Sequence, residues 1–65
     1  MKLINALPQA THANYIEIIK NNESILHTDS GDSTDIWNAL KEKNIDLDDQ
    51  CYMEFINNKC IITLI

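Results

Sequence analysis

The chain contains no arginine and no valine, and its 65 residues include one glycine, one proline and two cysteines. Ten acidic residues stand against five lysines, which gives a formal net charge of −5 at pH 7. Nucleic acids and anionic membranes bind proteins largely through Lys and Arg, because their phosphates must be neutralised. The composition therefore argues against direct nucleic-acid or membrane binding and favours a protein partner with a basic surface.

Long apolar runs are also missing. No stretch approaches the ~20 apolar residues of a membrane-spanning helix, and the N-terminus lacks the apolar segment of a signal peptide. We therefore expect a soluble, cytoplasmic protein with a single domain over residues 1–65. Because folding of so short a chain removes only about 60% of its surface from water, self-association or a partner is a plausible source of added stability.

A β-hairpin is predicted over residues 50–65, with Asn57 and Asn58 as its two-residue turn. Two consecutive Asn residues tolerate the positive φ that a type I′ turn needs at both central positions. The resulting register places three apolar pairs on one face, which is expected to line the core: Phe55 with Cys60, Met53 with Ile62, and Cys51 with Leu64.

A second hairpin is predicted over residues 14–28, with Asn21 and Asn22 as its turn. Its register is expected to set three pairs on one face: Lys20 against Glu23, Ile18 against Ile25, and Ile16 against His27. The three isoleucines make this the denser apolar face, so we expect it to point into the core.

One helix of about three turns is predicted between the hairpins. Asp32 or Ser33 would cap its start, and Asp35 in the first turn would favour the helix dipole. Its apolar stripe is expected to comprise Ile36, Trp37, Ala39 and Leu40, with Trp37 at the core edge or acting as an interface anchor. Asn44 is expected to end the helix in a left-handed conformation.

These elements predict an α+β fold in the order ββαββ, with or without an extra N-terminal strand. Residues 1–7 are expected to form a short strand or extended arm that ends at Pro8, and residues 9–13 a loop. Because one helix can cover only one face, we expect a small single antiparallel sheet with one helix packed on one face. The nearly all-apolar last strand is expected inside the sheet, in the order 1-2-4-3.

No catalytic, metal or cofactor signature stands out. The possible zinc ligands His12, His27, Cys51 and Cys60 lack the short pair spacings of structural sites, and residues 29–35 lack the Gly and Glu positions of a calcium loop. The two Cys lie roughly 13 Å apart in the hairpin register, beyond the ~7 Å reach of a disulfide, and a thiol on an apolar face is a poor nucleophile. A domain this small is also expected to lack a pocket of the usual ~300 Å³, so we expect neither an enzyme nor a cofactor protein.

Two surfaces are candidates for partner binding. The outer hairpin faces mix aromatic, apolar and acidic side chains: Tyr15, Glu17, Ile19, Leu26, Tyr52, Glu54, Ile61 and Ile65. Aspartates flank the helix: Asp29, Asp32, Asp35, Asp46, Asp48 and Asp49. Bare apolar patches usually mark interaction sites, whereas runs of carboxylates are commonly just solvated. Covering the outer face would require Glu17 and Glu54 to pair with Lys20, Lys59 or a basic partner.

Two functional hypotheses remain. The first is a small acidic inhibitor that blocks a basic nucleic-acid-processing enzyme, for example by mimicking DNA phosphates; small acidic anti-CRISPR and anti-restriction proteins share this size and charge. The second is a self-associating regulatory subunit, such as an antitoxin or immunity protein, with the mixed sheet face as a homodimer interface.

Neither a chelator nor a reductant should change the melting temperature, because no Cys or His has a partner at ligand or bridge spacing. Thermal unfolding followed by circular dichroism, with and without each reagent, checks this expectation. A drop of several degrees with either reagent would show that Cys51 and Cys60 have been misinterpreted.

Overall fold

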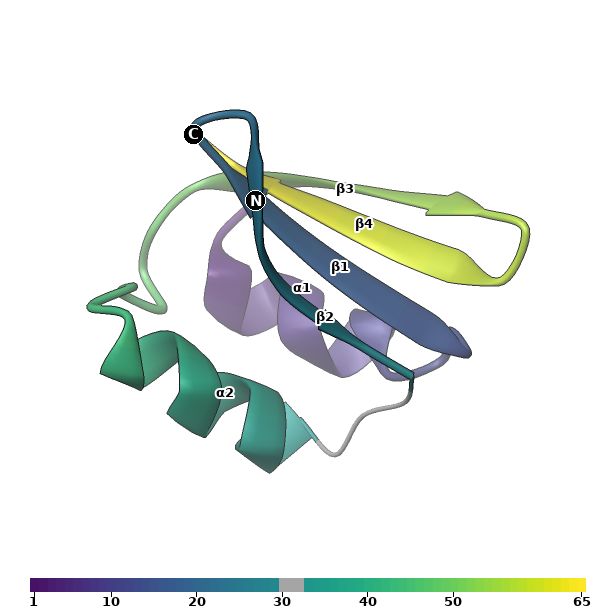
Figure 1. Ribbon diagram of the computed structural model, residues 1–65, viewed down its shortest axis with the longest axis horizontal. Helices are drawn as coiled ribbons and strands as arrows, with labels where there is room; N and C mark the ends of the chain where they lie inside the picture. The colour runs from purple at the N-terminus through teal and green to yellow at the C-terminus, as the bar shows by residue number, and fades with distance from the viewer. Residues whose placement is uncertain (30–32) are drawn as a thin grey trace.

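The computed structural model describes residues 1–29 and 33–65 and has an α+β fold with one sheet and two helices. The elements follow in this order: α1 (Leu3–Ala10), β1 (Tyr15–Lys20), β2 (Glu23–Thr28), α2 (Ser33–Glu42), β3 (Cys51–Ile56) and β4 (Lys59–Leu64). Both helices lie on the same side of the sheet (Figure 1). The core fills the space between them and the inner sheet face.

The C-terminal hairpin has the predicted register. Its turn residues Asn57 and Asn58 have φ values of 50° and 65°, the left-handed conformation that the type I′ turn requires. The predicted apolar pairs are confirmed: Phe55 with Cys60, Met53 with Ile62, and Cys51 with Leu64. Local turn chemistry therefore sets both the position of this hairpin and its inward face.

The first hairpin has the predicted turn but a different register. Asn21 and Asn22 have φ values of 53° and 64°, and Lys20 pairs with Glu23. An irregularity between Ile18 and Ile19 then shifts the pairing by one residue, as a β-bulge does.

The shifted register changes which side chains of β2 point inward. Ile18 pairs with Leu26 rather than Ile25, and Ile16 pairs with Thr28 rather than His27. Leu26 consequently packs against the core, so its predicted place on the outer face is wrong. Ile25 also contacts the core, as predicted.

The sheet is mixed, not antiparallel, and its strand order is β2-β1-β4-β3. β4 lies inside the sheet as predicted, but its second neighbour is β1, which runs parallel to it from the Tyr15–Lys59 pair to the Lys20–Leu64 pair. This pairing places the fully buried Ile16 and Ile18 beside Cys60 and Ile62. Burying the most apolar strands side by side at the centre explains why the expected order 1-2-4-3 is not formed.

Residues 3–10 form a helix, so the predicted N-terminal strand is wrong, and the predicted loop over residues 9–13 is confirmed only for residues 11–13. Its buried side chains recur at helical spacing: Leu3, Ala6, Leu7 and Ala10. Pro8 is exposed within this helix. The burial of one apolar stripe thus outweighs the local cost of a proline near the helix end. The order ββαββ with a single covering helix is accordingly replaced by αββαββ with two.

The start of α1 is capped by a distant loop rather than by its own side chains. The Leu3 N–H donates to the Asp49 carbonyl and the Ile4 N–H donates to the Leu47 carbonyl, both at 2.9 Å. Only Lys2 and the residue before it are extended beside β3, where Lys2 forms a bridge with Gln50. The predicted extended arm is therefore confined to these two residues.

Helix α2 is close to the prediction. Ile36 and Leu40 are buried, whereas Trp37 lies at the core edge and is 37% exposed. Asn44 has a φ of 60°, and the Ile45 N–H donates to the Leu40 carbonyl at 3.0 Å, so the predicted left-handed C-terminal cap is confirmed. The predicted N-terminal caps, Asp32 and the Ser33 side chain, lie outside the described part of the chain.

The exposure of Phe55 contradicts the prediction that this side chain lines the core. Its side chain is on the inner face, yet it is 52% exposed. The tip of the β3–β4 hairpin projects beyond both helices (Figure 1), so nothing in the described residues covers it from below. Truncating Phe55 should therefore cost far less than the ~3–5 kcal/mol of a buried aromatic residue.

A matched pair of substitutions in α1 tests the importance of this unexpected helix. Leu3→Ala should lower the free energy of unfolding by about 2–5 kcal/mol, because Leu3 is fully buried. Ile4→Ala should change it by less than about 1 kcal/mol, because Ile4 is 44% exposed. Urea denaturation measures both, and equal losses would contradict the position of α1.

Candidate protein-binding surface

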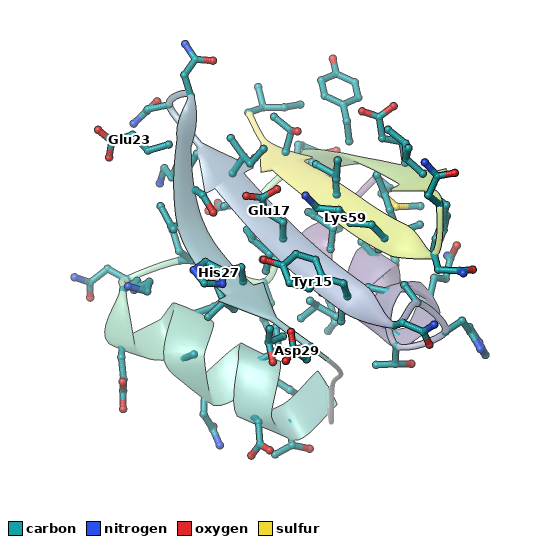
Figure 2. The ribbon with its side chains drawn as sticks, turned by 45° about the vertical axis from the view of Figure 1, so that its right-hand side comes forward. Tyr15, Glu17, Glu23, His27, Asp29 and Lys59 are labelled. Atoms are coloured by element: carbon teal, nitrogen blue, oxygen red, sulfur yellow. The ribbon has the colours of Figure 1, made fainter. Side chains whose placement is uncertain are left out.

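No helix or loop of the described residues covers the face of the sheet opposite α1 and α2. We define the outer sheet face by the strand residues that alternate with the buried ones: Tyr15, Glu17, Ile19, Ser24, His27, Tyr52, Glu54, Ile56, Lys59, Ile61 and Thr63. Four of these, Tyr15, Glu17, His27 and Lys59, are seen near one another over β1, β2 and β4 in Figure 2. Tyr52 is 69% exposed and Ile56 is 46% exposed. The sheet therefore presents aromatic and aliphatic side chains directly to solvent.

An ion pair lies in the middle of this face. Because β1 and β4 are parallel, Lys59 starts β4 beside Tyr15, and its ammonium reaches Glu17 with an Nζ–Oε1 distance of 3.0 Å. The Lys59 and Glu17 side chains are 39% and 21% exposed. One of the pairings that the sequence offered for Glu17 is thus formed, and its charge is already compensated within the face.

The ring of Tyr15 lies between two neighbours that hold it in place. The Lys59 Nζ is 5.1 Å from the centroid of the Tyr15 ring, within range of a cation–π contact. On the β2 side, the His27 ring is stacked on Tyr15 with centroids 6.3 Å apart and an interplanar angle of 16°. A ring held on both sides loses little side-chain freedom when a partner covers it.

Two hydrogen bonds fix the protonation state of Glu17. The bond from the Lys59 ammonium, followed by one from the Ser24 hydroxyl, lowers the pKa of the Glu17 carboxyl below its ordinary value of 4.5. Glu17 is therefore ionised at neutral pH. By contrast, Glu54 forms no ion pair among the residues that the structure describes.

The structure brings most of the predicted outer residues together. Tyr15, Glu17 and Ile19 come from β1, Tyr52 and Glu54 from β3, and Ile61 from β4; Ile65 follows at the sheet end and is 74% exposed. Leu26 is excluded because the bulge turns it inward. Sequence reasoning missed His27 for the same reason, and it left out Ile56 although strand alternation places it on this face.

The acidic loops do not form one cluster. Asp29 precedes α2 and Asp35 lies in its first turn, while Asp46, Asp48 and Asp49 follow its C-terminus. A ten-residue helix is about 15 Å long, so the two groups are held apart. Asp32 lies outside the described residues.

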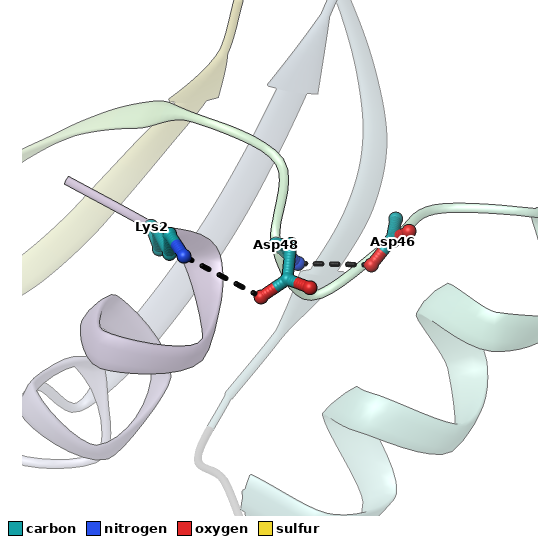
Figure 3. A network of polar contacts seen from close by, with 3 residues as sticks. All are labelled: Lys2, Asp46 and Asp48. Atoms are coloured by element: carbon teal, nitrogen blue, oxygen red, sulfur yellow. Dashed lines mark hydrogen bonds and ion pairs between the residues drawn. The ribbon is translucent and has the colours of Figure 1, made fainter.

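The aspartates after α2 shape their own loop (Figure 3). The Asp48 N–H donates to Asp46 Oδ1 at 2.9 Å, and the Asp46 N–H donates to Asp49 Oδ2 at 3.4 Å. Lys2 Nζ lies 3.9 Å from Asp48 Oδ1 in an exposed ion pair. Because this loop supplies the carbonyls that cap α1, these carboxylates have a structural role that does not require a partner.

One hollow lies between the two helices and the loop after α2, and a second lies along α2 and the same loop. An apolar one of about 130 Å³ is lined by Ile4, Leu7, Pro8, Trp37 and Leu47. An open one of about 410 Å³ extends from Trp37 past Lys41 and Asp46. The expectation that the domain would hold no hollow of ~300 Å³ is therefore wrong, although this one is a shallow surface groove. The Lys41 ammonium lies 4.7 Å from the Trp37 ring centroid and partly covers it.

The cysteine thiols and the possible metal ligands show no sign of a reactive site in the described residues. Cys51 and Cys60 are buried, free thiols, and burial raises the pKa of both, which keeps them protonated and poorly nucleophilic. Among residues 1–29 and 33–65, no three His, Cys, Asp or Glu side chains are grouped to hold a metal ion. Neither helix of this part of the chain is long and apolar enough to cross a membrane.

Comparison of the chain with protein-family models, with curated proteins and with solved structures found no match. The surfaces described above are therefore the basis for a functional proposal.

The ion pair predicts a specific pH dependence of stability. Because the pKa of Glu17 is lower in the folded than in the unfolded state, its contribution is fully present above about pH 4.5 and is lost as pH falls through the folded pKa. Glu17→Gln should remove this part of the acid-induced loss of stability. Glu54→Gln is the matched control, because Glu54 has no ion pair in the described residues, and it should leave the pH profile unchanged. Urea denaturation over a pH series measures all three proteins, and identical wild-type and Glu17→Gln profiles would rule out the pair.

Proposed function

We propose that the protein is a small binding module that docks its outer sheet face on a basic protein surface and so inhibits a nucleic-acid-processing enzyme. The proposal rests mainly on one observation: α1 and α2 both lie on one face of the sheet, and none of the residues that the structure describes covers the opposite face. Its exposed Tyr52 and Ile56 and its half-buried Tyr15, Ile19 and Ile61 make a mixed apolar and aromatic surface, and apolar surface gathered on one face often marks an interaction site.

The chemistry of the face supports docking. Tyr15 and Tyr52 offer rigid rings with polar ends, a residue type enriched at interfaces, and Ile61 and Ile56 add aliphatic area between them. Burying the charges of Glu17 and Lys59 costs less than burying either alone, because they remain paired at 3.0 Å. The face can therefore lose water without leaving a lone charge at its centre.

Charge favours a basic partner. The chain carries a formal charge of −5, and Glu54, beside Ile61 in the sheet, has no cation of its own in the described residues. A Lys or Arg of the partner would supply that cation, and opposite net charges would speed association. The nucleic-acid groove of an enzyme is such a surface, and occupying it would exclude the substrate.

The alternative is a self-associating regulatory subunit that uses the same face as a homodimer interface. The bare apolar face favours it, whereas bringing together two chains that each carry −5 opposes it. Analytical ultracentrifugation separates the two: the inhibitor proposal expects a monomer, and a stable dimer would support the alternative.

The test of the proposal is a pair of substitutions that add the same charge at different sites. Ile61→Lys places a cation in the outer sheet face, and Asn38→Lys places one on the exposed side of α2. Wild type and Asn38→Lys, each immobilised and then exposed to a host lysate, should capture the same nucleic-acid-processing enzyme. Both proteins should also inhibit that enzyme. Ile61→Lys should bind it at least about 30-fold more weakly, the loss typical of a central interface residue.

A third variant tests the acidic loop. Replacing Asp46, Asp48 and Asp49 with Asn keeps most hydrogen-bond acceptors but removes three charges. If this variant loses the enzyme while Ile61→Lys retains it, the acidic loop binds the target and the outer sheet face does not.

A further inference from the structure

The outer edge of β3 is open for most of its length. At its start, the Cys51 N–H donates to the Met1 carbonyl at 2.8 Å, and the Met1 amine donates to the Cys51 carbonyl at 3.1 Å. Both backbone groups of Cys51 therefore point away from β4. Because this direction repeats every second residue, the N–H and C=O groups of Met53 and Phe55 point the same way. Within the described residues, no backbone hydrogen bond satisfies them on that side.

The two edges of the sheet differ in how they are protected. β2, at the other edge, pairs with β1 through the irregularity at Ile18 and Ile19, and such bulges discourage a further strand from joining. β3 pairs with β4 in an unbroken register from Cys51 to Ile56. A straight, unprotected edge is a template for another strand.

Side chains along this edge are apolar on both sides of the sheet, with one exception. Phe55 and Met53 point to the inner side, where Phe55 is 52% exposed, and Tyr52 and Ile56 point to the outer side. The exception is Glu54, the single charged residue of β3. An added strand would gain apolar contacts on both sides and would meet one carboxylate.

We propose that this edge receives an extended segment of another protein as a fifth, antiparallel strand, with Lys or Arg opposite Glu54 and apolar residues opposite Met53 and Phe55. Strand addition supplies backbone hydrogen bonds for affinity and alternate side chains for selectivity. This inference deepens the proposed function, because it rests on a basic protein partner and names the element of that partner that is recognised.

A second copy of the chain fits the edge poorly. The antiparallel self-pairing that satisfies both open residues sets Met53 opposite Phe55 of the second copy, and Phe55 opposite its Met53. Glu54, between these two pairs, then lies opposite Glu54 of the second copy. This is a non-hydrogen-bonded pair, the kind in which opposite side chains are closest. Like charges directly opposite are unfavourable, so Glu54 opposes self-pairing while attracting a basic segment.

The probe is the capped peptide Thr-Val-Lys-Val-Thr, whose two Val residues would lie opposite Phe55 and Met53. Titration of the isotope-labelled protein should shift the amide resonances of Met53 and Phe55 and slow their hydrogen exchange. The matched peptide with Glu in place of Lys should bind roughly tenfold more weakly, and Glu54→Lys should reverse this preference. No binding at millimolar peptide, shifts confined to other strands, or equal binding of the two peptides would overturn the proposal.

Backbone methylation tests strand addition with the wild-type protein. An N-methyl group on either Val removes a hydrogen bond to β3 and should abolish binding. An N-methyl group on the central Lys points away from β3 and should be tolerated. Equal effects at the two kinds of position would mean that the peptide does not bind as a strand.

Two protein variants separate this inference from the proposed function. Met53→Pro removes an N–H that points away from β4, so it should leave the sheet intact and abolish peptide binding. Ile19→Lys alters the outer sheet face on β1 but should leave edge binding within about twofold, since β4 separates β1 from the β3 edge. If the captured enzyme is lost with Ile19→Lys but retained with Met53→Pro, the proposed function stands and the edge inference fails.

Discussion

The parallel pairing of β1 with β4 is the contact on which the rest of the structure depends. Each hairpin can form from local sequence, but only this pairing joins the two into one sheet. On one side it assembles the buried centre of the core from Ile16, Ile18 and Ile62. On the other side it brings Glu17 beside Lys59 and so builds the middle of the outer sheet face. The register of this one pairing therefore determines both the centre of the core and the middle of the candidate binding surface.

The parts of the fold that depend on local chemistry could be predicted from the sequence. The Asn57-Asn58 turn fixes the register of its hairpin, and Asn44 ends α2 because these side chains tolerate positive φ. Helix α1 is not predicted, although its buried residues recur at helical spacing, because Pro8 lies within it and a proline usually ends or precludes a helix. Its capping by the loop carbonyls of Leu47 and Asp49 is a contact between distant segments. The parallel pairing is non-local in the same sense, and no local pattern specifies it.

The candidate site was predictable to the extent that strand alternation holds. Tyr15, Glu17 and Ile61 fall on the outer sheet face because each alternates with buried neighbours. The prediction failed at β2, where a single bulge moved Leu26 inward and turned His27 toward Tyr15. A bulge shifts every later residue of the strand to the other face, and its position depends on packing against the core. The exposure of Phe55 also depends on tertiary structure, since it reflects how far the helices reach beneath the hairpin.

The most direct test of this arrangement is a set of cross-strand nuclear Overhauser effects measured on the labelled protein. Parallel pairing of β1 with β4 predicts backbone contacts between Glu17 and Ile61, together with side-chain contacts between Lys59 and the Tyr15 ring. Backbone contacts from β2 to β4, with none from β1, would contradict the strand order. They would also remove the ion pair at the middle of the outer sheet face, because Glu17 and Lys59 would no longer be neighbours.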